Sequence, residues 1–412
     1  MYGRGGRAVR GRYLSSKEAC QALGVRSQTL YAYVSRGLIR SEPMGGKSRA
    51  RRYHGEDVER LAQGKQLRKD PTRAARRALR TGDPVLESSL TLITEEALYY
   101  RGLDVLELAR ERSLEEVAAL MWTGDAGAVE TIRAKVLIES GFEGALPEGL
   151  SPLQQVQAVL PMAAALDSAA ADLQPLSLYR VGWRILQLMT RAICGRNAAE
   201  TGVGRALQQA WLPRRRKAAR SLEAGLILCA DHELNVSAFT ARCVASSGAN
   251  LYAVVSAALG ALQGFRHGAA VQRLDGMWQE IEAVGDVRRA VVLRLERGDR
   301  IPGFGHAVYR GMDPRARVLL ELVEETFPES DALRVAAELQ QVVREVMELE
   351  CNIDLALATL VRAAGLPSGS AIQLFALGRV VGWIAHALEQ YATGELIRPR
   401  AAYVGVLPEE SG

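Results

Sequence analysis

The 412-residue sequence has few cysteines and no long apolar run, and each shortage excludes a class of protein. No uninterrupted apolar run approaches the roughly 18–20 residues of a membrane-spanning helix, and the charged N-terminus lacks the apolar stretch of a signal peptide. The five cysteines are an odd number at wide spacings, without a CxxC pair. Neither a disulfide framework nor a metal site is therefore predicted, and a reducing cytoplasm is the expected location.

Positive charge is concentrated at the start of the chain. Residues 1–80 carry 20 Lys and Arg against six Asp and Glu, a net charge of +14. Since the whole chain carries +5, residues 81–412 carry a net charge of −9. A basic head joined to an acidic body predicts an anionic partner for the head, and nucleic acid is the leading candidate.

The pattern of residues 1–65 predicts a small winged helix-turn-helix domain. Ser15 and Glu18 fit a capping box, Gly24 a turn, and Ser27 the cap of a second helix over 28–35. The glycine-tipped basic hairpin at 45–53 and the acidic segment after it resemble the wing and third helix of MerR-type regulators. The DNA contacts expected are Gln28, Thr29 and Tyr31 from the second helix, and Arg49, Arg51 and Arg52 from the hairpin. The alternative is a solvated appendage that serves oligomer contacts.

The rest of the chain predicts an all-α fold. Residues 66–84 are basic and contain few large apolar side chains, so they are interpreted as a linker. From 85 to 412 alanine and leucine dominate, aromatics are scarce, and Gly or Pro recurs every 10–25 residues. One short hairpin is expected at 90–100, with its turn at Glu95 and Glu96.

Three of the five histidines lie in short motifs suited to polar catalysis. His232 is in Asp-His-Glu, His267 in Gly-Phe-Arg-His-Gly and His306 in Gly-Phe-Gly-His, while Asp354 places a carboxylate in an otherwise apolar run. Two histidines and one carboxylate are what carbon–carbon bond formation through an enol requires: a base, a donor to the enol oxygen and a donor to the attacked carbonyl. His386 lies between apolar residues and is predicted to be structural.

These motifs, with Ser-Ser-Gly-Ala-Asn at 246–250, resemble the citrate synthase family over about residues 85–405. The resemblance implies a large and a small helical domain that condense acetyl-CoA with oxaloacetate to citrate, as in the tricarboxylic acid cycle. Asp354 would be the base, His267 the donor to the thioester oxygen and His306 the donor to the keto carbonyl. Acyl-CoA would be a substrate and no cofactor is implied. The residues implied for the keto acid are His232, Arg315, Arg379 and Arg398, and those for CoA are Gly303, Gly305 and Arg310.

In the family the C-terminal arginine, here Arg398, reaches the site of the neighbouring subunit, which implies a homodimer or a higher homo-oligomer. Two departures concern the surroundings of the catalytic trio. A histidine common in the family is Cys229 here, and Val271 and Gln272 replace an Asn and a Glu after the motif of His267. One hypothesis is a preference for propionyl-CoA, giving 2-methylcitrate. Another is lost turnover, in a DNA-binding regulator that senses CoA esters or a keto acid.

Overall fold

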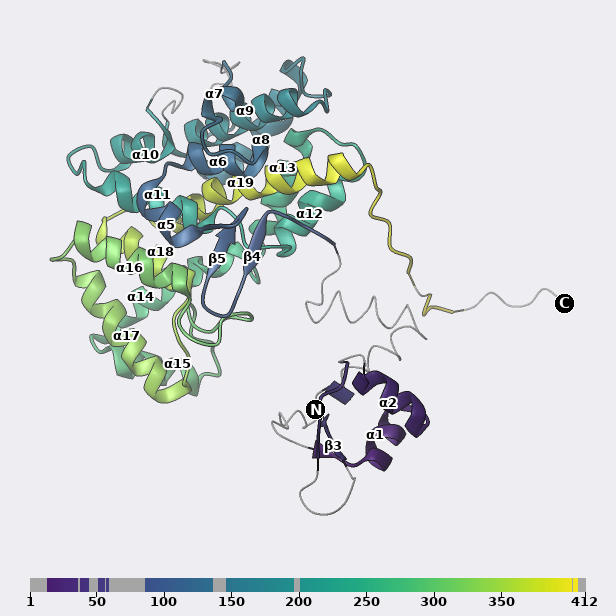
Figure 1. Cartoon of the computed structure of the whole chain (residues 1–412). Coiled ribbons are helices and arrows are strands. Elements are labelled where there is room, and N and C mark those ends of the chain that lie inside the picture. Colours follow the sequence, from purple (N-terminus) through teal and green to yellow (C-terminus); the bar gives the residue numbers. More distant parts are fainter. Residues whose placement is uncertain are drawn as a thin grey trace. The chain divides into compact units, whose positions relative to one another are not determined.

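The chain divides into two compact units, residues 1–87 and 88–412, in a computed structural model (Figure 1). The structure describes residues 13–35, 38–43, 51–55, 57–58, 86–135, 146–195, 201–401 and 403–406. The linker predicted at 66–84 and the side chain of Arg49 lie outside these ranges.

The first unit is a helix-turn-helix with a small antiparallel sheet. Its elements are β1 (Tyr13–Leu14), α1 (Ser16–Leu23), α2 (Ser27–Ser35), β2 (Ser41–Pro43) and β3 (Arg51–His54), and the sheet order is β1-β3-β2. The capping box of Ser15 and Glu18 is present, and α1 ends at Gly24 with φ of 60°. Ser27 is the first residue of α2 rather than its cap, so that boundary is off by one position. Leu30 and Tyr53 are buried in its small core.

The second unit is a helical body with one short sheet (Figure 1). Its strands are β4 (Thr91–Ile93), β5 (Leu98–Tyr100) and β6 (Leu103–Asp104), antiparallel in that order, so the expected hairpin is confirmed. The first helices are α5 (Val105–Glu111), α6 (Leu114–Thr123), α7 (Val129–Ile132), α8 (Pro152–Leu166), α9 (Pro175–Cys194), α10 (Val203–Trp211), α11 (Ala218–Cys229), α12 (Val236–Ala245) and α13 (Leu251–Leu262). The others are the 3₁₀ turn η2 (Gly268–Ala270), α14 (Gln272–Val284), α15 (Val287–Glu296), α16 (Pro314–Thr326), α17 (Asp331–Met347), α18 (Ile353–Ala363) and α19 (Ser370–Thr393).

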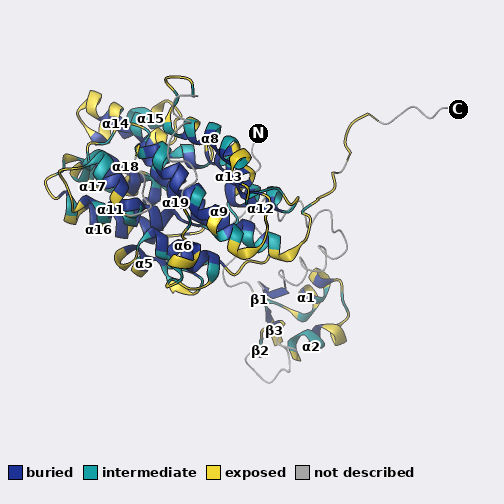
Figure 2. Cartoon of the chain, turned by 90° about the horizontal axis from the view of Figure 1, so that it is seen from above, coloured by how far each residue is buried: buried dark blue, intermediate teal, exposed yellow. Residues whose placement is uncertain are grey.

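Helices α14 to α17 gather on one side of this unit, and most of the others surround α19 (Figure 1). This arrangement is the all-α fold with a large and a small helical part that the sequence predicts. Helix α19 is the central core helix and is buried along most of its length (Figure 2). Its length and mean hydropathy of 1.4 would suit a membrane span, but 89% of the apolar window is buried inside the fold. In the sequence Arg379 and His386 interrupt this apolar stretch.

Two glycines of α19 allow α11 to approach closely. A Cβ at Gly378 would overlap the carbonyl oxygen of Leu226, and one at Gly382 would overlap that of Ala230. The main-chain N–H of Gly382 donates to the Ala230 carbonyl at 3.1 Å. Because only glycine fits here, the C-terminal end of α11 and the segment after it are held against α19.

Candidate active site

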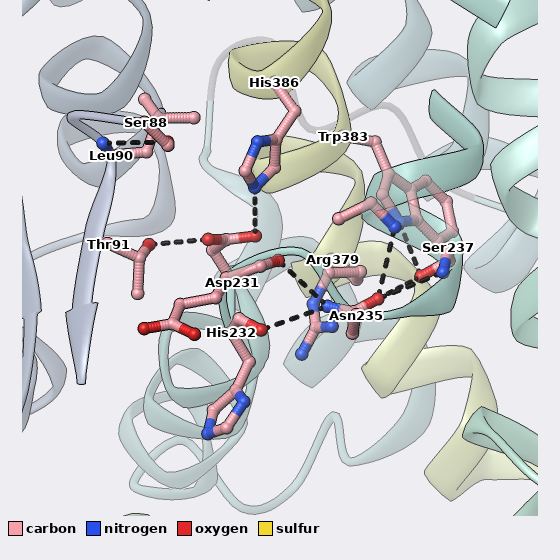
Figure 3. A network of polar contacts seen from close by, with 12 residues as sticks. Ser88, Leu90, Thr91, Asp231, His232, Asn235, Ser237, Arg379, Trp383 and His386 are labelled. Atoms are coloured by element: carbon pink, nitrogen blue, oxygen red, sulfur yellow. Dashed lines mark hydrogen bonds and ion pairs between the residues drawn. The ribbon is translucent and has the colours of Figure 1, made fainter. Parts of the chain in front are cut away.

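The segment after α11 carries two polar side chains that point in opposite directions, Asp231 toward α19 and His232 away from it (Figure 3). Asp231 is fully buried, accepts a hydrogen bond from Thr91 Oγ1 at 2.5 Å and lies 3.2 Å from Nε2 of His386. Burial alone would raise the pKa of Asp231, but His386 and Arg379 hold it below its ordinary value. The pair Asp231–His386 thus anchors the turn that presents His232.

His232 and His306 lie together, with their ring centres 5.1 Å apart. Burial and the charge of Arg315 lower the pKa of both histidines, that of His232 well below its ordinary value. Arg379 acts on His232 in the same direction. Both rings are therefore neutral near pH 7, so each carries one ring proton and one bare nitrogen.

The hydrogen bonds of His306 determine which nitrogen carries its proton. The main-chain N–H groups of Val308 and Tyr309 donate to Nδ1 at 3.1 and 3.4 Å. Since Nδ1 accepts, the ring proton lies on Nε2. His306 is thus held as a neutral donor, the form needed for its predicted role.

His267 is held by Ser237. Its Nε2 lies 2.8 Å from Ser237 Oγ. The same oxygen also accepts from Trp383 Nε1 at 3.0 Å (Figure 3). The Ser237 hydroxyl donates to Asn235 Oδ1 at 2.8 Å, and the latter oxygen accepts the main-chain N–H groups of Ser237 and Ala238. These contacts of Ser237 fix the orientation of the His267 ring. Burial lowers the pKa of His267 to about 4, so this ring too is neutral.

Asp354 lies in the first turn of α18, where its main-chain N–H donates to the capping residue Asn352 at 3.0 Å. Burial raises the pKa of its carboxyl to about 6, although Arg315 and Arg379 oppose this rise. Among the residues that the structure describes, none donates a hydrogen bond to this carboxylate. A carboxylate of this kind is mostly ionised at pH 7 yet more basic than an exposed one, as a general base requires.

The loop that carries His306 is bonded to the start of α18. Gly303 and Gly305 have φ of 83° and 75°, which favours glycine. The main-chain N–H of Asn352 donates to the carbonyl of Gly303, and its side-chain amide donates to that of Gly305, both at 3.0 Å. The predicted donor and the predicted base are thus tied to one another through Asn352.

Arg315 is buried and forms a bidentate ion pair with Asp313, from Nε at 3.0 Å and from Nη2 at 2.8 Å. Asp313 also accepts the main-chain N–H of Ile353, which fixes the start of α18 to that of α16. The ion pair raises the pKa of Arg315 despite its burial, so the guanidinium remains charged. With two of its nitrogens bound to Asp313, Nη1 remains for a ligand.

Arg379 is the second buried guanidinium. Its Nε donates to the carbonyl of Cys229 at 2.6 Å and its charged group lies 4.8 Å from the Phe375 ring centre. Within the described ranges no carboxylate lies at ion-pair distance from it, and burial lowers its pKa. The thiol of Cys229 stays neutral because burial raises its pKa to about 12. This residue therefore places an uncharged group beside Arg379.

Two predicted contacts lie outside this cluster. Arg398 is exposed in the segment after α19, and the single chain does not bring it to the other residues. Arg310 is exposed, and its Nε lies 3.5 Å from Glu95. Both residues of that pair line a hollow of about 410 Å³ beside His306.

In the first unit the predicted DNA contacts fall into two groups. Gln28, Thr29 and Tyr31 are exposed on α2. Arg51 and Arg52 are bound to their own sheet: Arg51 donates to Ser41, and Arg52 pairs with Glu42 at 2.9 Å and lies over the Tyr13 ring.

Three residues with a clear place in the site were not identified from the sequence. Asp313 lies two residues before Arg315 and Ser237 lies five residues after His232, so their closeness in the sequence to residues already singled out was a usable signal. The hydroxyl of Tyr309 lies 3.3 Å from His232 Nε2. The sequence gave no signal for this residue, because a lone tyrosine in a loop fits many roles.

Comparison with known proteins agrees with this fold. Residues 79–400 match the family of the citrate synthase C-terminal domain, and residues 13–66 match a helix-turn-helix domain family. Citrate synthase 2 of Bacillus subtilis is 30% identical over 345 residues, 77% of this chain and 93% of the relative. The 2-methylcitrate synthase of Shewanella oneidensis is 29% identical over 355 residues, 77% of this chain and 91% of the relative. The crystal structure of citrate synthase from Thermotoga maritima is 30% identical and has a TM-score of 0.67, covering 80% of this chain and 96% of that one.

A helical fold with these motifs in this order defines an enzyme of the citrate synthase type. The chain belongs to the citrate synthase family and carries an N-terminal helix-turn-helix domain in addition.

Proposed function

We propose that the chain condenses an acyl-CoA, either acetyl-CoA or propionyl-CoA, with oxaloacetate to give citrate or 2-methylcitrate and free CoA. The observation that carries this proposal is the protonation state of three groups. Asp354 has a pKa of about 6, while His267 and His306 are neutral and His306 carries its ring proton on Nε2. One base and two neutral donors are the set that enol formation and carbonyl attack require.

The reaction follows from these groups. Asp354 removes a proton from the carbon next to the thioester, and a ring N–H of His267 donates a hydrogen bond to the thioester oxygen, so that an enol forms. The enol carbon attacks the keto carbonyl of oxaloacetate, and Nε2–H of His306 gives its proton to that oxygen. Water then cleaves the thioester and releases CoA, which makes the turnover irreversible.

Two cations and one histidine of a single chain would bind the keto acid: Arg315, Arg379 and His232. Arginine suits this role because its planar fork matches a carboxylate. We propose that Arg398 completes the site from a second copy of the chain, since it is exposed and apart from the cluster within one chain. A homodimer follows from this proposal. CoA would lie along Gly303 and Gly305, with Arg310 released from Glu95 to contact a phosphate.

The test is release of free thiol from acetyl-CoA and from propionyl-CoA in the presence of oxaloacetate. We expect release with at least one of them, and the ratio of the two kcat/KM values names the substrate. A catalytically dead variant, Asp354→Ala, is the control. Bound oxaloacetate without any thiol release would contradict the proposal.

The second candidate function is DNA binding through the first unit, in a regulator that senses the same ligands. The observation that favours it is the exposed row of Gln28, Thr29 and Tyr31 on the second helix of a helix-turn-helix. Because Arg51 and Arg52 are engaged within their own sheet, α2 rather than the strand would supply the base contacts. Selection of bound sequences from a random DNA pool tests this. We expect Thr29→Ala with Tyr31→Ala to abolish selection while the thiol assay is unchanged, and no enriched sequence for the parent would contradict DNA readout.

A further inference from the structure

Tyr309 touches the proposed keto-acid site on several sides, although the proposed reaction gives it no part. It is 3% exposed, and its hydroxyl lies 3.3 Å from Nε2 of His232. Its ring lies against that of His306, with centres 4.8 Å apart and planes at 34°. The guanidinium of Arg315 lies 5.7 Å from the centre of the same ring. One side chain thus contacts three residues proposed to bind or protonate the keto acid.

The hydrogen bond between Tyr309 and His232 indicates the role of this hydroxyl. His232 is neutral, so one of its ring nitrogens is bare and can accept a proton. Burial raises the pKa of Tyr309 to about 12, so the phenol stays protonated and can donate to Nε2 of His232.

The main chain of Tyr309 acts on the other histidine. Its N–H is one of the two that donate to Nδ1 of His306 and thereby place the ring proton on Nε2. The Tyr309 ring, which lies against that of His306, limits how far His306 can rotate. The nitrogen that each histidine presents is thus determined in part by the same residue.

We propose that Tyr309 is a positioning residue for both histidines: its hydroxyl sets the tautomer and orientation of His232, and its ring holds His306 in place. This inference rests on the proposed function only in naming a keto acid as the ligand. In Tyr309→Phe the ring remains but Nε2 of His232 loses its partner. We expect keto-acid affinity to fall about tenfold, the effect of losing one buried hydrogen bond, with the KM for acyl-CoA within about twofold of the parent's. In Tyr309→Leu we expect kcat to fall as well, because His306 loses the ring that lies against it.

The experiment compares both variants with Tyr252→Phe as a control. Tyr252 is a buried tyrosine of α13, outside the site, and this change removes its hydrogen bond to Asp167. Steady-state kinetics gives the two KM values. Nitrogen-15 NMR of the imidazoles gives the tautomer of His232, expected as Nδ1–H in the parent with a changed Nε2 signal in Tyr309→Phe. Unchanged keto-acid KM and unchanged Nε2 signal would overturn the proposal, as would an equal rise of both KM values like that of a loosened fold. Should the parent not turn over, the proposed reaction fails, while calorimetric binding of oxaloacetate and the NMR signals still test Tyr309.

Discussion

Replacing Asp354 by asparagine should abolish proton exchange at the acyl carbon and, at the same time, stabilise the second unit at neutral pH. The fold raises the pKa of this carboxyl from 3.8 to about 6, which corresponds to about 3 kcal/mol of unfavourable free energy when the group is ionised. Because the folded-state pKa is the higher one, the unfolded chain loses this proton first as the pH rises. The contribution of the protonated Asp354 carboxyl to the free energy of unfolding is present below about pH 4, is lost between about pH 4 and 6, and is absent above pH 6.

Asparagine carries no charge to bury, so the stabilisation by Asp354→Asn should grow from near zero at pH 4 to about 3 kcal/mol at pH 7.5. All five tryptophans of the chain lie in the second unit, so their fluorescence reports its unfolding. A shift of several degrees in Tm at pH 7.5 is expected for this change. Asp331→Asn is the matched control, because that carboxylate is exposed and paired with Arg334, so its loss cannot reproduce this rise. A difference between Asp354→Asn and the parent that is the same at both pH values would refute burial as the cause of the raised pKa.

Three further predictions concern other parts of the second unit. If Arg398 acts across a dimer, Arg398→Ala and Asp354→Ala should each be inactive, whereas an equal mixture of the two variants should regain about a quarter of the parental activity once their subunits have exchanged. No recovery of activity after verified subunit exchange would place Arg398 in its own subunit's site. Burial raises the pKa of Glu223 to about 8, and its carboxyl accepts from the main-chain N–H of Leu114 at 2.6 Å. The free energy of unfolding should therefore fall as the pH rises from about 4.5 to 8, and Glu223→Gln should flatten this fall in urea unfolding curves. The same pH dependence in variant and parent would show that this carboxyl titrates normally. Gly382→Ala should destabilise the unit by about 3 kcal/mol and impair keto-acid binding, because a Cβ would overlap the Ala230 carbonyl; a neutral effect on Tm would contradict the close approach of α11 and α19.

The sequence predicted the elements whose signals are local. The capping box at Ser15 and Glu18 and the hairpin turn at Glu95 and Glu96 depend on residues within a few positions, and both are present. The second helix of the head begins at Ser27 itself, because a serine can be the cap or the first residue of a helix and the letters do not distinguish them. The motifs around His232, His306 and Asp354 were also recognisable as short patterns.

What the sequence could not supply are contacts between segments far apart in the chain. His386 was predicted to be structural, but its pairing with Asp231 joins positions 155 residues apart and no pattern links them. The hydroxyl of Ser237 likewise reaches His267 only because α12 lies beside the segment after α13. These contacts fix how each ring is oriented, so the chemistry of each histidine depends on tertiary structure even where the histidine itself could be predicted.

The charges in the site indicate which ligand it favours. Asp313 neutralises Arg315, whereas Arg379 has no carboxylate at ion-pair distance within the described ranges, and burial disfavours its charge. An incoming carboxylate would relieve that unfavourable burial, so part of the binding free energy of a keto acid arises at Arg379. The same carboxylate is a second negative charge near Asp354 and would raise the pKa of the base further. In the proposed reaction, binding of the keto acid would therefore make Asp354 a stronger base and would couple the arrival of one substrate to proton removal from the other.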